Sequence, residues 1–246
     1  MNDIYRLTPI HHWHAENGAR FIIEDGWKRV ESYGNAVDEV ESVSTRVGIC
    51  DVTPMTKIDL QGKSLTPVLA PCLESGPIPD AGFWAPGNVH ADEGKTAVRV
   101  ARLRADRFLI LGPAAHRQAL FHRFRDLAPA EECAHVTDMT SAFAAFRLSG
   151  PESTQVLKKI CPINLDGRSF ASGRCAQALL ARVGAVLLRD DIGDLPNYII
   201  LVSRDYGEYV WEGVVHAGQK YGMRWYGLSA ARRLDQGKGN VAAIQH

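Results

Sequence analysis

The sequence of 246 residues has no excess of charge of either sign, because 28 acidic side chains balance 28 basic ones. A chain without a net field does not attract nucleic acid or an anionic membrane over its whole surface. The longest apolar runs, such as YIILV at 198–202, have the length of a strand and are far too short to span a bilayer. We therefore expect neither nucleic acid nor a membrane as a partner.

Cysteine is scarce, and an odd number of cysteines at scattered spacings argues against a disulfide framework. Reduced thiols buried as small hydrophobic side chains are expected at all five positions: Cys50, Cys72, Cys133, Cys161 and Cys175. The N-terminal MNDIYRLTPI also lacks the basic start and apolar stretch of a secretion signal. Both features predict a cytoplasmic protein.

A metal site is the first possibility raised by TPIHHWH at 8–14, which holds His11, His12 and His14. The spacing lets at most two of these rings converge, and no Cys-x-x-Cys pair, His-x-x-x-His pair or nearby acidic cluster supplies further ligands. We predict no metal site, and expect these rings to serve packing or hydrogen bonding instead.

An internal duplication is visible when IDLQGKSLTPVL at 58–69 is aligned without gaps on FRLSGPESTQVL at 146–157, with Gly62 opposite Gly150. In both copies apolar residues stand two and four positions before the glycine, as in a half-buried strand. Pro151 then begins a helix with an apolar stripe in the second copy. The first copy, with Pro67 inside, is expected to form a poorer helix.

Further strands and one helix follow in each copy. The segment 97–111 predicts a hairpin that turns at Ala105 and Asp106, and 175–191 with 197–203 take the same place in the second copy. The closing helices are expected at 113–126 and 204–222, and the second should bury one face made of Tyr206, Tyr209, Val210, Val214 and Ala217. The chain thus predicts an α+β fold of duplicated β-α-β-β-α units with antiparallel sheets.

The domain organisation expected is a single domain over 1–246, built from two related halves at about 1–130 and 135–230. They would join near 128–137, and a cleft between them would be the natural place for a ligand. The Pro- and Gly-rich segment 69–95 cannot be regular throughout. Its aromatic pair, Phe83 and Trp84, could cover a ligand, fix a partner subunit or pin the segment to the body.

Long blocks of the sequence resemble the folate-binding aminomethyltransferases, the family of the glycine-cleavage T-protein. The first blocks are TPIHHWHAENGARFIIEDGWKRVESYG at 8–34 and STRVGICDVTPMTKIDLQG at 44–62; TPIHHWH is most similar to the folate domain that ends the large subunit of heterotetrameric sarcosine oxidase. LSGPESTQVLKKICPINLDG at 148–167 and SRDYGEYVWEGVV at 203–215 look like the small gamma subunit of that oxidase. The resemblance covers nearly the whole chain.

This resemblance implies a T-protein-like folate-binding fold. The segment GLSAARRLDQGKGN at 227–240 is similar to the family segment after which full T-proteins continue into a small barrel, which implies that the C-terminal barrel is lacking here. It also implies tetrahydrofolate as the cofactor, which accepts a one-carbon unit released when a flavin-containing partner oxidises an N-methyl amine. No G-x-G-x-x-G motif follows a strand here, so redox chemistry would have to come from flavin-containing oxidoreductase subunits.

The site residues implied by the resemblance differ from the family's pattern. The family's catalytic aspartate falls at Thr96 and Ala97, so no catalytic residue is predicted, and its pteridine-gripping glutamate falls at Tyr198. The predicted cofactor-binding residues are therefore Met55, Asp194, Tyr198 and Arg233. Three of these have plain alternatives: Met55 as core filler, Asp194 as a turn residue and Arg233 as an ion-pair partner of Asp235.

Two functions follow from these features. The first is an accessory subunit of a flavin-dependent N-methyl amine oxidoreductase, which needs no carboxylate of its own. The second is a free-standing tetrahydrofolate-dependent aminomethyl- or methyltransferase, against which the missing acids weigh. Aromatic side chains expected at an interface are Trp84, Trp211, Trp225 and Tyr226, with a core position as the alternative for Trp211.

Overall fold

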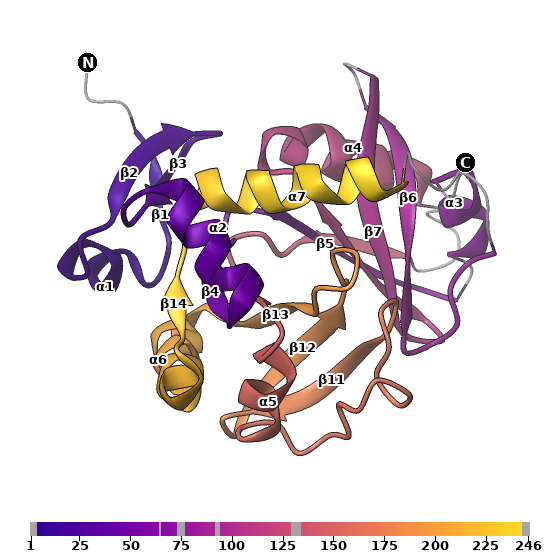
Figure 1. Ribbon diagram of the computed structural model, residues 1–246. Coiled ribbons are helices and arrows are strands. Elements are labelled where there is room, and N and C mark those ends of the chain that lie inside the picture. The colour runs from indigo at the N-terminus through magenta and orange to yellow at the C-terminus, as the bar shows by residue number, and fades with distance from the viewer. Residues whose placement is uncertain (1–3, 64, 73–76, 92–93, 129–133, 243–246) are drawn as a thin grey trace. The chain divides into compact units, whose positions relative to one another are not determined.

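The computed structural model describes residues 4–63, 65–72, 77–91, 94–128 and 134–242 (Figure 1). The chain divides into two compact units. Unit 1 comprises residues 1–53, 143–172 and 177–246, and unit 2 comprises residues 54–142 and 173–176. The predicted junction Pro129–Cys133 lies outside the described residues.

Unit 1 is built on a six-stranded sheet in the order β11-β12-β13-β10-β4-β14. Strands β12, β13, β10 and β4 pair antiparallel, and β14 joins β4 in parallel. The bounds are β4 Gly48–Asp51, β10 Phe143–Ser149, β11 Cys175–Leu180, β12 Val183–Arg189, β13 Asn197–Ser203 and β14 Arg224–Trp225. A separate three-stranded sheet has the order β1-β3-β2, with β1 Arg6–Leu7, β2 Arg20–Glu24 and β3 Trp27–Ser32.

The helices of unit 1 bury the central strands of its larger sheet. Their bounds are α1 His11–Glu16, α2 Ala36–Thr45, α5 Ser153–Lys158, α6 Gly207–Gly218 and α7 Leu228–Ala242. Helix α6 sets Trp211 against Phe146 of β10, with ring centroids 5.2 Å apart. Helices α2 and α7 lie together (Figure 1) and bury Val43 and Ala231 with Cys50 of β4. Burial by helices explains why β10 and β13 are apolar almost throughout.

Unit 2 has a five-stranded sheet in the order β6-β7-β8-β5-β9. Its elements are β5 Thr56–Gln61, α3 Thr66–Leu69, β6 Phe83–Ala91, β7 Gly94–Arg104, β8 Arg107–Gly112, α4 Arg117–Leu127 and β9 His135–Asp138. Alternate side chains of the strands, such as Ile58 and Val100, form one core with Leu120 and Phe124 of α4. This alternation is the period-2 pattern of a sheet that buries one face under a helix.

The predicted duplication is present in the order of the elements. The succession β5-α3-β6-β7-β8-α4 corresponds to β10-α5-β11-β12-β13-α6, and the sheets repeat the spatial orders β6-β7-β8-β5 and β11-β12-β13-β10. The α+β class with antiparallel-rich sheets is thereby confirmed, as is the hairpin turn at Ala105 and Asp106. The prediction of a single domain over 1–246 with halves at about 1–130 and 135–230 stays a prediction.

Each copy has one more strand than the β-α-β-β-α unit that we predicted. The additional strand in the first copy is β6, which lies inside the segment 69–95 that we predicted not to be regular throughout. It pairs with β7 along its whole length, despite Pro86 and Gly87. The Pro- and Gly-rich composition did not reveal this strand, because proline is tolerated on an edge strand and β6 is the edge of its sheet.

The buried face of α6 differs from the predicted one. Val210, Val214 and Ala217 are buried as expected, but Tyr206 and Tyr209 are 53% and 54% exposed. Trp211 takes their place in the core and is fully buried, which confirms its core alternative. Tyr206 lies outside α6, which begins at Gly207 after a 3-10 turn over Arg204–Tyr206, and Tyr209 lies on the face of α6 turned away from the sheet.

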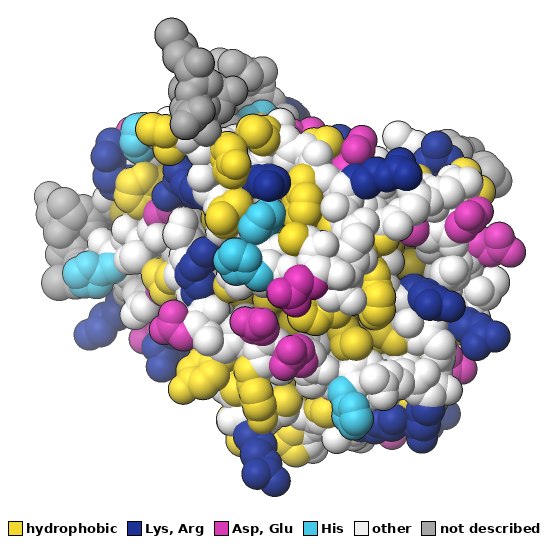
Figure 2. All heavy atoms as spheres, turned by 90° about the vertical axis from the view of Figure 1, so that its left-hand side faces the viewer, with side chains coloured by type: hydrophobic (Ala, Val, Ile, Leu, Met, Phe, Trp, Pro, Cys, Tyr) yellow, Lys and Arg dark blue, Asp and Glu magenta, His cyan; other side chains and the backbone are white. Residues whose placement is uncertain are grey.

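The four described cysteines, Cys50, Cys72, Cys161 and Cys175, are free and buried, as predicted, and Cys133 lies outside the described residues. Among the described residues, none of the helices combines the length and apolar character needed to cross a bilayer. Side chains of both charges are interspersed with hydrophobic ones on the face shown in Figure 2. This mixture agrees with the balanced composition.

Candidate functional site

The predicted folate-binding residues are distributed over both units. Met55 lies in unit 2, in the turn before β5, where it is half-buried and its carbonyl oxygen accepts a hydrogen bond from Lys57 Nζ at 3.1 Å. Asp194, Tyr198 and Arg233 all belong to unit 1. The three unit 1 residues occupy a turn, a central strand and a helix respectively.

Tyr198 is a core residue of unit 1. Its side chain is fully buried on β13, and its hydroxyl lies 2.7 Å from the hydroxyl of Thr154 on α5. The guanidinium of Arg189 stacks over the ring at 5.6 Å. Burial raises the pKa of Tyr198, so the phenol stays protonated. The hydroxyl that the resemblance assigns to the pteridine thus already has a partner in Thr154.

Asp194 and Arg233 are exposed. Asp194 follows Gly193 in the turn that Ile192 and Leu195 close as a β-bridge, which matches its alternative as a turn residue. The alternative for Arg233, an ion pair with Asp235, is wrong. Both oxygens of Asp235 accept hydrogen bonds from Arg147, at 2.8 and 3.0 Å.

The two positions of the missing catalytic aspartate lie on β7. Thr96 is buried, and its hydroxyl is 2.7 Å from Nδ1 of His116. Ala97 is exposed and has no polar side-chain atom. A pteridine needs a carboxylate as acceptor for its N–H donors, and none of the predicted residues supplies a buried one. These residues therefore do not fit a tightly held folate.

A buried polar network around Arg147 was missed from the sequence. Arg147, on β10, donates to Asn197 Oδ1 at 3.0 Å and to the two oxygens of Asp235 on α7. The Ser149 hydroxyl donates to the same Asn197 oxygen at 2.7 Å and lies 2.9 Å from the hydroxyl of Tyr226. Tyr226 is 1% exposed, so its predicted interface position is wrong. The available signal was a charged residue inside the apolar strand FAAFRLS at 143–149.

A second buried network contains His14, the last histidine of the run at 8–14. His14 on α1 lies with Nε2 at 3.1 Å from Asp51 Oδ2, and the Tyr33 hydroxyl lies 2.5 Å from His14 Nδ1. The backbone N–H of Thr53 donates to the other oxygen of Asp51 at 2.9 Å. The side chains of His14 and Asp51 are only 1% and 3% exposed. The predicted hydrogen-bonding role is thus confirmed for His14.

One arrangement of hydrogens satisfies this network. Burial raises the pKa of Tyr33, which keeps its hydroxyl protonated and able to donate to Nδ1 of His14. Nε2–H of His14 then donates to Asp51. Among the described residues, no group of three or more His, Cys, Asp or Glu side chains is arranged to hold a metal ion.

The Asp51 network predicts a dependence of stability on pH. Burial alone would raise the pKa of Asp51, but hydrogen bonds from His14 and Thr53 hold it below its ordinary value. A depressed folded-state pKa contributes stability above the unfolded pKa of about 3.9, and this contribution is lost as the pH falls through the folded value. We expect the urea midpoint to fall below about pH 5. In Asp51→Asn the fall should be shallower; identical slopes would contradict the assignment.

The family comparison matches residues 10–243 to the GCVT N-terminal domain. An aminomethyltransferase from Halothermothrix orenii is 27% identical over 248 residues, covering 95% of this chain and 65% of the relative. The sarcosine oxidase subunit alpha from Corynebacterium sp. strain U-96 is 26% identical over 267 residues, covering 99% of this chain and 27% of the relative. The chain therefore spans 65% or less of these curated relatives.

Solved structures show the same fold. The glycine cleavage system aminomethyltransferase T from Bartonella henselae superposes with a TM-score of 0.81 at 18% identity, over 94% of this chain and 62% of that one. A chain of heterotetrameric sarcosine oxidase from Corynebacterium sp. U-96, in complex with pyrrole 2-carboxylate, superposes with a TM-score of 0.64 at 22% identity, over 88% and 96% of the two chains. The fold is therefore T-protein-like, and the chain belongs to the aminomethyltransferase-like family defined by the GCVT N-terminal domain.

Proposed function

We propose that this chain is an accessory, folate-domain-like subunit of a flavin-dependent complex that oxidises N-methyl amines of the sarcosine or dimethylamine type. In that complex it handles the one-carbon product or supports assembly. The feature that carries the proposal is the absence of a carboxylate at the positions that the resemblance assigns to the two family acids. Thr96 and Tyr198 stand in place of acids, and their hydroxyls already face His116 and Thr154 inside the protein.

The similarity to sarcosine oxidase supports this role. The match to the alpha subunit covers 99% of the chain, and the structural match covers 96% of the oxidase chain, which is therefore comparable in length to this one. A subunit of that size within a complex does not need to carry every group for catalysis. The flavin-containing oxidoreductase subunits would supply the redox chemistry, and a cytoplasmic location stays a prediction.

The second candidate is a free-standing tetrahydrofolate-dependent aminomethyl- or methyltransferase. The matches to aminomethyltransferases over 95% of the chain favour it. It would require Met55, Asp194 and Arg233 to form the folate site without a buried acid. Such an enzyme would need a proton donor for the leaving atom, and Asp194, the one carboxyl group among these side chains, is exposed.

The accessory role predicts co-purification with a flavoprotein. The tagged chain, expressed in its native host and isolated under mild conditions, should elute with flavin absorbance and with activity toward sarcosine or dimethylamine. The free chain should show neither. A free chain that transfers a methyl or aminomethyl group to tetrahydrofolate without any flavoprotein would contradict the proposal and favour the second candidate.

Folate affinity provides an independent prediction. Each lost hydrogen bond to a charged group is worth about 1.5–3 kcal/mol, so we expect the free chain to bind tetrahydrofolate at least about 100-fold more weakly than a family member with both carboxylates. Anaerobic isothermal titration of both proteins measures the difference. Equal affinities would show that the chain has another acidic anchor and would overturn the argument from the missing acids.

A further inference from the structure

An apolar and basic surface lies on unit 1 where β11 meets the start of α6. Leu179 of β11 is 53% exposed, and Tyr206 and Tyr209, one helical turn apart, are 53% and 54% exposed. Large hydrophobic side chains exposed together to this extent mark interaction sites more often than isolated ones do. We call the surface formed by Leu179, Arg182 and Tyr209 the β11–α6 face.

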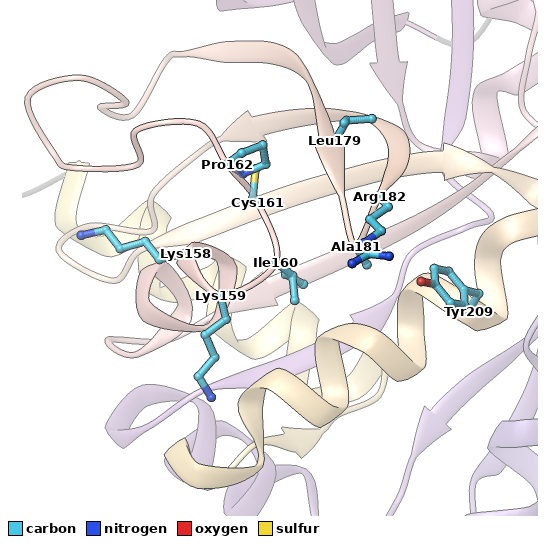
Figure 3. A pocket seen from close by; sticks show the side chains of 9 residues that line it. All are labelled: Lys158, Lys159, Ile160, Cys161, Pro162, Leu179, Ala181, Arg182 and Tyr209. Atoms are coloured by element: carbon cyan, nitrogen blue, oxygen red, sulfur yellow. The ribbon is translucent and has the colours of Figure 1, made fainter.

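A hollow of about 490 Å³ opens on this face. Ile160, Cys161 and Pro162 line it together with Leu179, and Tyr209 lies opposite them across Ala181 and Arg182 (Figure 3). The hollow is therefore largely apolar. Its volume lies within the range of sites that enclose one or a few side chains or a small ligand.

The charged side chains that line the hollow are all basic. Its lining contains Lys158, Lys159 and Arg182 and no acidic residue. The two lysines have contacts of their own, because Lys158 Nζ donates to Asp166 at 2.5 Å and Lys159 Nζ donates to the carbonyl oxygen of Ala217 at 2.8 Å. Both extend away from the centre of the hollow in Figure 3. Arg182 is exposed and is the cation best placed to receive an anionic group from outside.

Arg182 is held in a tight turn. The connection between β11 and β12 consists of Ala181 and Arg182, with φ of 48° and 70°, the left-handed pair that a two-residue hairpin requires. The N–H of Ala181 donates to the carbonyl oxygen of Ile160 at 2.8 Å, which ties the turn to the rim of the hollow. A cation on a tied turn loses little freedom on binding, so it is suited to recognition.

The same face includes the edge of a sheet. Strand β11 is the last strand of the six-stranded sheet, and its first residue is already paired, because Cys175 N–H donates to the carbonyl oxygen of Gly82 at 2.9 Å; the remaining edge runs from Ala176 to Leu180. Exposed edges of this kind are sites at which another chain can add an extended segment. The edge, the half-exposed aromatics and the Arg182 turn therefore offer main-chain, apolar and charged contacts together.

We propose that the β11–α6 face is the docking surface for the flavin-containing partner subunit, which inserts a segment with an apolar side chain into the hollow and places a carboxylate at Arg182. The inference rests on the proposed function, because it names the surface by which the accessory subunit joins its complex. Charge complementarity selects the acidic segment, and the apolar lining selects its neighbouring side chain. Trp211 and Tyr226, which are buried, take no part.

The test uses tagged full-length variants isolated from the native host. Tyr209→Glu, Leu179→Asp and Arg182→Glu should each reduce the recovered flavoprotein at least about tenfold, as expected when a central interface residue is changed. The matched controls are Ile23→Asp and Arg20→Glu, on the separate three-stranded sheet, where Ile23 is 55% exposed. They should recover the wild-type amount. All substituted side chains are at least half-exposed or lie at the surface, and a thermal melt of each free variant verifies folding.

The outcomes distinguish the two proposals. If the wild-type chain recovers no flavoprotein, the proposed accessory function fails. If the wild type and all three variants recover it equally, the accessory function stands and the docking surface is wrong. A photo-reactive amino acid at 209 should cross-link to the flavoprotein, and one at 23 should not. A homodimer of the free chain that Tyr209→Glu dissociates would identify a second copy as the occupant and overturn the proposal.

Discussion

Replacing Asp51 by alanine is expected to lower the free energy of unfolding by about 2–6 kcal/mol, because two buried donors would each lose their acceptor at a cost of about 1–3 kcal/mol. The carboxylate is 3% exposed and faces His14 Nε2 at 3.1 Å. Its other oxygen accepts the N–H of Thr53. Without Asp51 both donors would be buried without an acceptor, because the His14 ring packs against Trp211 with 5.2 Å between the ring centroids.

Two control variants separate this network from general effects of truncation. Tyr33→Phe removes only the hydroxyl at the far end of the network and should cost about 1 kcal/mol. Asp166→Ala removes an exposed carboxylate paired with Lys158 and should cost less than about 1 kcal/mol. Urea unfolding followed by tryptophan fluorescence measures all three. If Asp51→Ala costs no more than Asp166→Ala, the network does not stabilise the fold.

Much of the fold could be predicted because its signals are local. The hairpin at Ala105 and Asp106 is marked by alternating strands around a two-residue turn, and the repeated strand order follows from the aligned glycines Gly62 and Gly150. Helix α4 lies within one or two turns of its predicted range because its apolar spacing is regular. These elements depend on neighbouring residues, which a sequence displays directly.

The parts that could not be predicted depend on tertiary contacts. Arg147 and Asp235 are 88 residues apart in sequence, and no local pattern pairs them. Tyr206 and Tyr209 fit a helical stripe as well as Trp211 does, and only the sheet beneath α6 decides which is buried. Tyr198 aligned with a family site residue, but its orientation toward Thr154 of α5 is visible only in three dimensions.

In the candidate site, too, the local motifs could be recognised in the sequence, but the contact between them could not. DVTPM at 51–55 attracted attention for Met55, whereas the buried acid in it is Asp51, whose partner His14 lies 37 residues away. Both parts of the network are visible in the sequence as separate motifs, TPIHHWH at 8–14 and DVTPM at 51–55. Their contact could not be inferred, because a histidine run and a strand-end aspartate each have many other uses.

The two aligned glycines provide the second large prediction, because they should tolerate a side chain very differently. Gly150 has φ of 126°, a conformation that side chains of L-residues rarely adopt, and a Cβ there would lie 2.5 Å from the carbonyl oxygen of Arg46 and 2.7 Å from that of Val43. Gly62 has no positive φ, and its Cβ would approach Ala134 Cα at 3.0 Å. Equivalent positions in the repeat therefore have different reasons for glycine.

Gly150→Ala is accordingly expected to cost about 2–6 kcal/mol, the sum of backbone strain and overpacking against backbone atoms that cannot rotate away. Gly62→Ala should cost about 1 kcal/mol, since only a small shift of Ala134 relieves the contact. Gly184→Ala, where no atom lies within 4 Å of the added Cβ, is the neutral control. Soluble yield and urea unfolding measure the series. Equal losses at Gly150 and Gly62 would mean that glycine serves the same role in both copies, whereas a selective loss at Gly150 places the constraint in its contact with the end of α2.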